Sequence, residues 1–176
     1  SRVLGESLRE RVGDVDLAVV GEMVRHRETA AHAMAAMGPE PARAEIEHAG
    51  WNEFDHEQVV VAYKPAYKSK TRMVADLARR KDPRRTFQEV FEASLQRWVV
   101  AGDDDDAYPE SWQAFGDRAL AALHDLDKQL GKGGSALVFT SGGPISAVSA
   151  RLLGVGPEGW LQLNRVIANA SITKII

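Results

Sequence analysis

The chain has 176 residues, of which 44% are hydrophobic and 27% charged, and its formal net charge is −3. This length and composition predict one soluble globular domain over residues 1–176. The absence of cysteine excludes disulfides and thiolate chemistry and indicates a reducing, cytoplasmic location. No apolar run reaches the ~20 residues of a membrane span and no signal peptide opens the chain, so we expect no membrane association.

The first third of the chain predicts helices alternating with strands. The apolar run VDLAVV is typical of a strand buried on both faces, and the helix after it ends at Gly38–Pro39. The loop GWNEFDH at 50–56 combines two aromatic side chains with acidic and imidazole groups. In chain order, the expected helix, strand, helix and short strand span Val3–Val12, Val15–Val20, Arg25–Met37 and Ala44–His48.

The middle of the chain predicts helices without a strand between them, from about residue 56 to 100. Pro65 interrupts the first of these helices, and Thr86-Phe-Gln-Glu89 reads as a capping box that starts the last. Residues 64–85 hold nine Lys or Arg against two Asp, a local charge of +7. We expect this segment to be a helical excursion over the functional site.

The basic segment has two interpretations. A nucleic-acid surface would combine such charge with interleaved aromatic side chains. Here only Tyr63 and Tyr67 meet that requirement, which favours a solvated helical face, and we expect no nucleic-acid partner.

The last third of the chain centres on SALVFTSGGPISAVSARLLG, residues 135–154. It predicts a buried strand over Ala136–Phe139, a tight turn over Thr140–Gly143 and a helix entered through Pro144. Ser111 should cap the long helix that precedes this unit. A short helix at Trp160–Ile167 and a final strand at Ala170–Ile176 complete the prediction. The fold class is therefore α/β, a three-layer α/β/α sandwich with a mostly parallel sheet.

The turn at 140–143 predicts an anion site, because it directs free N–H groups and the positive end of a helix to one point. The alternative is that any α/β domain contains such strand–turn–helix units. Arg25 should stand at the same sheet edge, where its planar charged fork suits a phosphate. Arg27 cannot face inward as well, so we assign it to the surface.

Glutamate and histidine are two further residue types with possible roles in catalysis. Glu53 lies between Trp51 and Phe54, and apolar neighbours that raised its pKa would suit it to proton donation. His56 lies close to Glu53. The other histidines are expected to be structural or exposed, namely His26, His32, His48 and His124. There is no HExxH, Walker loop, GxGxxG or zinc spacing, so no metal or cofactor is expected.

Five segments together resemble the histidine phosphatase superfamily, which has the phosphoglycerate-mutase-like fold. LGESLRERVGDVDLAVVGEMVRHRETAAHAM resembles its helix, strand and R-A-x-x-T-A segment, and GWNEFDHE its L-x-E-x-x-G region. ESWQAFGDRALAAL is similar to the helix before the last catalytic strand. ALVFTSGGPISAVSARLLG resembles the V-x-S-H-G-G-x-I-x-x-L segment, and LNRVIANASITKII the closing strand.

The resemblance implies a role for each matching residue. Arg25, Ser141 and Gly142 would bind phosphate, and Glu53 would be the acid. The family's nucleophile is the histidine of an Arg-His-Gly at the end of a first strand, which would precede Ser1. We expect the natural protein to continue beyond both ends of this sequence. Ser141 stands where the family has its second histidine, and its hydroxyl binds a phosphoryl oxygen without supplying positive charge.

These residues support two functions of different classes. The first is a phosphomonoesterase that acts through a phosphohistidine on a small anionic phosphorylated substrate. The second is a catalytically weak or inactive domain of the same fold that binds a phosphorylated ligand or a partner protein. Phosphatase against mutase activity, substrate identity and a homo-oligomeric state stay open.

Overall fold

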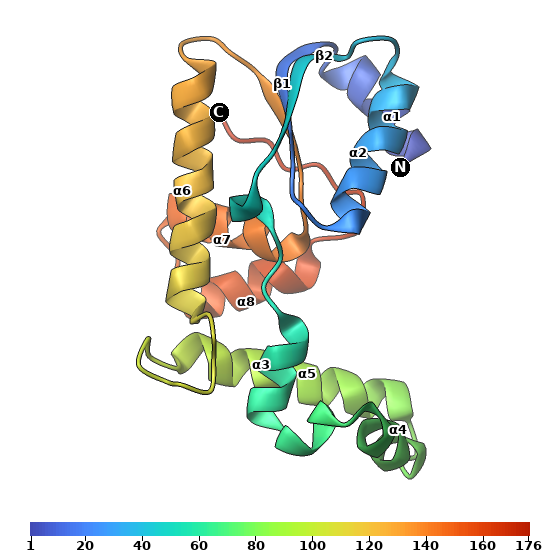
Figure 1. Ribbon diagram of the computed structural model, residues 1–176, viewed down its shortest axis with the longest axis vertical. Helices are drawn as coiled ribbons and strands as arrows, with labels where there is room; N and C mark the ends of the chain where they lie inside the picture. The colour runs from blue at the N-terminus through green and yellow to red at the C-terminus, as the bar shows by residue number, and fades with distance from the viewer. The chain divides into compact units, whose positions relative to one another are not determined.

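The computed structural model describes all 176 residues, and the chain forms two compact units (Figure 1). One comprises Ser1–Glu53 and Gly116–Ile176, and we call it the sheet unit. The other comprises Phe54–Phe115, and we call it the helical unit. None of the helices combines the length and the hydrophobicity that spanning a membrane requires.

A three-stranded parallel sheet forms the centre of the sheet unit. β1 (Val15–Val20) lies between β2 (Ala42–Glu47) and β3 (Ala136–Phe139). The expected strands at 15–20 and 136–139 are confirmed, and β2 begins two residues earlier than expected. Val20 pairs in register with Phe139, so β1 and β3 end together at one edge of the sheet.

The first face of the sheet is covered by α1 (Arg2–Arg11) and α2 (Val24–Met37) (Figure 1). Ala18 and Val20 of β1 belong to the buried apolar cluster on this face, together with alanines of α2. Because side chains alternate along a strand, Leu17 and its alternate neighbours point to the opposite face. β1 is therefore buried on both faces, as its continuous apolar run predicts.

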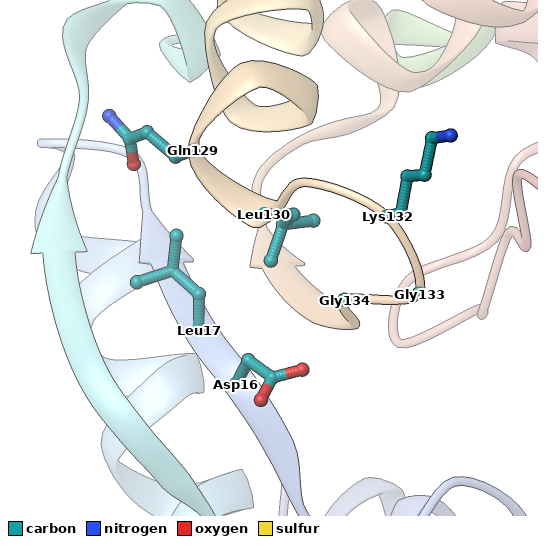
Figure 2. Close-up of a pocket in the computed structure, with 7 residues that line it drawn as sticks. All are labelled: Asp16, Leu17, Gln129, Leu130, Lys132, Gly133 and Gly134. Atoms are coloured by element: carbon teal, nitrogen blue, oxygen red, sulfur yellow. The ribbon is translucent and has the colours of Figure 1, made fainter.

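The second face is covered by α6 (Trp112–Leu130), of which residues 116–130 belong to the sheet unit (Figure 1). This arrangement confirms the three-layer α/β/α class. Near the end of α6 lies a pocket of about 410 Å³ (Figure 2), at the edge where the strands begin. It is lined by Asp16, Leu17, Gln129, Leu130, Lys132, Gly133 and Gly134.

Two helices follow β3, and no strand follows them. α7 (Gly142–Leu153) ends at Gly154, whose φ of 66° is left-handed, and it packs against α8 (Pro157–Val166). The expected final strand at Ala170–Ile176 is wrong, because these residues are irregular and exposed. The φ of Ala170 is 61°, which interrupts an extended backbone, and no other strand pairs with the segment.

The helical unit contains α-helices and one 3₁₀ helix, as expected for a segment without strands. Its core includes the rings of Phe54, Trp98 and Phe115, whose centroids lie 4.7 to 5.7 Å apart. Ser111 caps α6 as predicted, its Oγ accepting from Ala114 N at 3.0 Å. In order, the unit's elements are α3 (His56–Tyr63), η2 (Pro65–Lys68), α4 (Lys70–Ala78) and α5 (Pro83–Val100).

The capping box expected at Thr86–Glu89 is wrong. α5 begins three residues earlier, at Pro83, with Asp82 as its N-cap accepting from Arg85 N. Asp followed by Pro suits the N-cap and first helical positions, and it leaves Thr86 inside the first turn. Glu89 instead pairs with Arg85, four residues before it.

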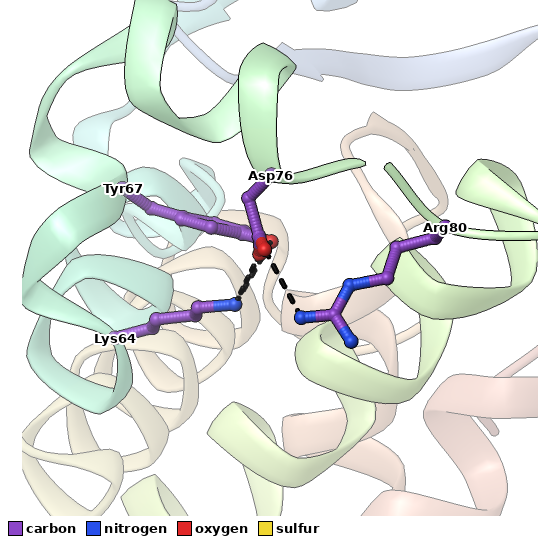
Figure 3. Close-up of polar contacts among 4 residues, drawn as sticks. All are labelled: Lys64, Tyr67, Asp76 and Arg80. Atoms are coloured by element: carbon purple, nitrogen blue, oxygen red, sulfur yellow. Dashed lines mark hydrogen bonds and ion pairs between the residues drawn. The ribbon is translucent and has the colours of Figure 1, made fainter. Parts of the chain in front are cut away.

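Two of the basic side chains in residues 64–85, the segment of local charge +7, bind an acidic side chain of the same segment (Figure 3). The Asp76 carboxylate accepts from Lys64 Nζ at 2.6 Å, from the Tyr67 hydroxyl at 2.8 Å and from Arg80 Nη2 at 3.0 Å. These three donors hold the pKa of Asp76 well below its usual range, and bonds to Asp76 and Tyr67 raise the pKa of Lys64. The cluster ties α4 to the chain around η2.

Candidate active site

The common end of β1 and β3 brings two distant segments together within the sheet unit. Arg25 lies in the first turn of α2, and Ser141 lies between β3 and α7. Arg25 Nη2 and Nε donate to Ser141 Oγ at 3.0 and 3.2 Å. Two of the residues expected in a phosphate pocket are thus in direct contact across 116 positions of sequence.

Ser141 occupies the N-cap position of α7, yet its hydroxyl does not cap the helix. A serine at this position ordinarily accepts a hydrogen bond from the second or third helical N–H. Here Oγ is bonded to side chains of α2 instead. The hydroxyl and the N-terminal end of α7 therefore meet at one point, where the helix dipole favours an anion.

His26 is a site residue that the sequence did not indicate. Its side chain is 2% exposed, and Nε2 lies 2.5 Å from Ser141 Oγ. Burial, and secondarily the charge of Arg25, lower the pKa of His26 to about 4, against a weak opposing bond to the Gly21 backbone. The ring is consequently neutral at neutral pH. One signal could have indicated it: His26 stands where the family motif R-A-x-x-T-A has alanine.

Gly21 sets the position of this ring. A Cβ atom on Gly21 would lie 2.2 Å from His26 Nδ1, closer than any side chain allows. Nδ1 is buried against the Gly21 backbone without a well-aligned hydrogen bond. Only glycine at this position leaves room for the imidazole behind Ser141.

Glu53 reaches the same turn from the loop after η1 (Ala49–Trp51). Its Oε2 accepts from Gly143 N, in the first turn of α7, at 3.2 Å. The loop that carries Glu53 is held by Arg118 of α6, whose Nη1 donates to the carbonyl oxygens of Ala49, Gly50 and Asn52 at 3.0 to 3.2 Å.

Three more hydrogen bonds attach this loop to the ends of β1 and β3. Asn52 Oδ1 accepts from Glu22 N at 2.7 Å, and Asn52 Nδ2 donates to the Glu22 carboxylate at 3.0 Å. Thr140 Oγ1 donates to the Trp51 carbonyl at 2.6 Å. The carboxyl group of Glu53 is therefore fixed relative to both strands that position Arg25 and Ser141.

The remaining candidates lie elsewhere or have other partners. Gly142 begins α7, and a Cβ there would make only ordinary contact with Ile167, so the fold itself does not require glycine. Arg27 pairs with Glu47 of β2 at the surface, as expected. His56 is the first residue of α3 in the helical unit and is exposed. No group of three or more His, Asp or Glu side chains is placed to hold a metal ion.

The sequence matches one protein-family model. The model of the histidine phosphatase superfamily (branch 1) matches residues 80–176, more than half of the chain. The chain belongs to the histidine phosphatase superfamily. No curated protein matches it.

Among the solved structures that share the fold of this chain are a mutase and a putative phosphatase. Phosphoglycerate mutase from Bacillus anthracis str. Sterne is 16% identical with a TM-score of 0.53, over 86% of this chain and 64% of that one. A putative alpha-ribazole-5'-P phosphatase from Escherichia coli str. K-12 substr. MG1655 is 17% identical with a TM-score of 0.53, over 92% of this chain and 69% of that one. The chain thus spans about two thirds of each relative, and at these identities the likeness is one of fold.

Proposed function

We propose that the complete protein is a phosphomonoester hydrolase that acts through a phosphohistidine on a small anionic phosphorylated substrate. One observation carries the proposal: the Arg25 fork, the Ser141 hydroxyl and the Glu53 carboxyl group meet at the N-terminal end of α7. A fixed cation, a hydroxyl and helix N–H groups are the donors that a phosphoryl group requires. Membership of the superfamily supports the same chemistry.

In the first step, a histidine attacks phosphorus. An N–P bond forms as the bond between phosphorus and the leaving alcohol breaks, and Glu53 gives its proton to the departing oxygen. By the resemblance, this histidine precedes Ser1, and we assign the role to none of the five histidines in residues 1–176. Arg25 and the first turn of α7 stabilise the charge on the phosphoryl oxygens during transfer.

In the second step, water replaces the histidine on phosphorus. The Glu53 carboxylate takes a proton from the water as its oxygen bonds to phosphorus, and the N–P bond breaks to release inorganic phosphate. The similar structures include both a mutase and a putative phosphatase. Release of inorganic phosphate, rather than transfer to a second hydroxyl of the substrate, distinguishes the hydrolase that we propose.

The test compares two arginines of α2 in the full-length protein. Arg25→Ala should lower kcat/KM with a phosphoester panel by roughly 10²- to 10³-fold, the usual loss for one transition-state donor. Arg27→Ala is the matched control, because Arg27 pairs with Glu47 at the surface, and it should retain activity. Absence of an acid-labile phosphohistidine in the full-length protein would refute the proposal, as would equal losses in the two variants.

A second candidate is a binding domain of the same fold with little or no turnover. It is favoured by Ser141, which supplies a neutral hydroxyl at a position where the superfamily motif has histidine. If the protein is such a binding domain, it should bind phosphoesters without hydrolysing them, and Glu53→Gln should leave this binding unchanged. Rapid hydrolysis by the full-length protein excludes it.

A further inference from the structure

Residues 26 and 141 are two of the positions at which the chain departs from the motifs of the superfamily, and their side chains touch each other. His26 stands in place of alanine and Ser141 in place of histidine. The imidazole absent from position 141 is thus present 2.5 Å from the Ser141 hydroxyl, contributed by α2. The inference below rests on the proposed function and concerns how this pair meets a phosphoryl group.

The hydrogen bonds of the pair are fully determined in the ligand-free protein. A serine hydroxyl accepts two hydrogen bonds and donates one. Arg25 supplies both donors to Ser141 Oγ, so the hydroxyl proton points to His26 Nε2. Nε2 must therefore be unprotonated, which agrees with the low pKa of this buried ring.

A phosphoryl group would disturb this arrangement in a defined way. The Arg25 donors turn to the phosphoryl oxygens, and the Ser141 proton turns with them. His26 Nε2 and Ser141 Oγ would then face each other with lone pairs at short range, beside a ring that is itself buried. One proton on Nε2 removes this repulsion and completes the hydroxyl's bonds.

We infer that His26 and Ser141 form a proton-linked relay, in which anion binding protonates His26, His26 donates to Ser141 Oγ, and Ser141 donates to the phosphoryl oxygen. The balance is one proton taken from solution for each dianion bound. His26 is a positioning residue in this scheme, because it acts through Ser141. The bound dianion supplies the negative charge that a buried imidazolium requires.

The charged groups around the ring are consistent with this linkage. Arg25 precedes His26 on α2 and opposes its protonation in the absence of an anion. Glu22, in the loop before α2, is bonded to Asn52, and Glu53 is bonded to Gly143 N. An incoming dianion that engages Arg25 therefore offsets the arginine charge, which after burial is the second cause that lowers the pKa of His26.

Sulfate is the probe, because it stays a dianion from neutral to mildly acidic pH and cannot deliver the proton itself. Its affinity for the full-length protein, measured by calorimetry, should rise roughly tenfold for each unit fall in pH, the slope for one linked proton. His26→Gln should abolish the slope, whereas His32→Gln, on the exposed side of α2, should keep it. Glu53→Gln should also keep the slope, which distinguishes titration of the His26 ring from titration of the carboxyl group bonded to Gly143 N.

Ser141→Ala is the second variant for the sulfate titration, and it leaves the buried His26 ring in place. It should abolish the slope, because the hydroxyl that carries the proton to the anion is gone. Sulfate affinity that is independent of pH in the wild type, or a slope that survives in both His26→Gln and Ser141→Ala, overturns the relay. No measurable sulfate binding overturns it too. Failure of the proposed function has a different signature, the absence of phosphohistidine and of phosphoester turnover.

Discussion

Burial of a neutral histidine makes the stability of the ligand-free sheet unit depend on pH. The pKa of His26 falls from 6.5 to about 4 on folding, so the unfolded chain binds more protons between these values. The contribution of His26 to the free energy of unfolding is fully present above pH 6.5. It is lost as pH falls from 6.5 towards 4. At about 1.4 kcal/mol per pH unit, the full loss is about 3 kcal/mol, and about 2 kcal/mol of it should be gone at roughly pH 5.

Urea unfolding at a series of pH values between neutral and mildly acidic measures this loss. Because two compact units need not unfold together, the transition should be followed by NMR signals of β1 as well as by circular dichroism. His26→Gln should flatten the pH dependence over this window, whatever its stability at neutral pH. His32→Gln is the control and should behave as the wild type. If His26→Gln retains the wild-type dependence, the ring is not buried in its neutral form and the reasoning fails.

Three further predictions concern the acid and the helical unit. Glu53→Gln should slow hydrolysis of an alkyl phosphate by roughly 10²- to 10⁴-fold and that of p-nitrophenyl phosphate much less, because nitrophenolate leaves without a proton. Trp98→Ala removes a fully buried ring and its 2.9 Å bond to the Glu110 carbonyl, and should cost about 3 to 5 kcal/mol in urea unfolding. Asp76→Asn should destabilise the helical unit at neutral pH. The difference from the wild type should shrink only as pH falls below the usual pKa of aspartate, because the folded-state pKa of Asp76 is lowered.

The fold was predictable where local signals act alone. The apolar runs at 15–20 and 136–139 mark buried parallel strands without reference to their partners, and Gly154 marks a helix end. One error arose because two N-cap signals lie close together at the start of α5. The helix begins at the Asp82–Pro83 signal rather than at Thr86. The other error concerned residues 170–176, because extended conformation is stable only when another strand pairs with it.

The candidate site was predictable in part. A short distance after an apolar strand suffices to place Arg25 and Ser141 at the carboxyl edge of a sheet. That Ser141 contacts Arg25 depends on which strands are neighbours, and this follows from the sheet order β2-β1-β3. His26 looked like one of several helical histidines, since its burial depends on the space beside Gly21 rather than on any pattern around it.

Strand register links these observations to the proposed chemistry. Gly21 N donates to the Phe139 carbonyl at 3.0 Å, which continues the β1–β3 ladder one step beyond the paired ends. A slip of one residue between the two strands would reverse the side to which each side chain points. Ser141 would then face away from α2, and neither Arg25 nor His26 would reach its hydroxyl. The hydroxyl would instead be free to cap α7, the ordinary role of serine at this position. The contact of Ser141 with α2 rather than with its own helix is therefore a consequence of register, and the anion site that we propose depends on it.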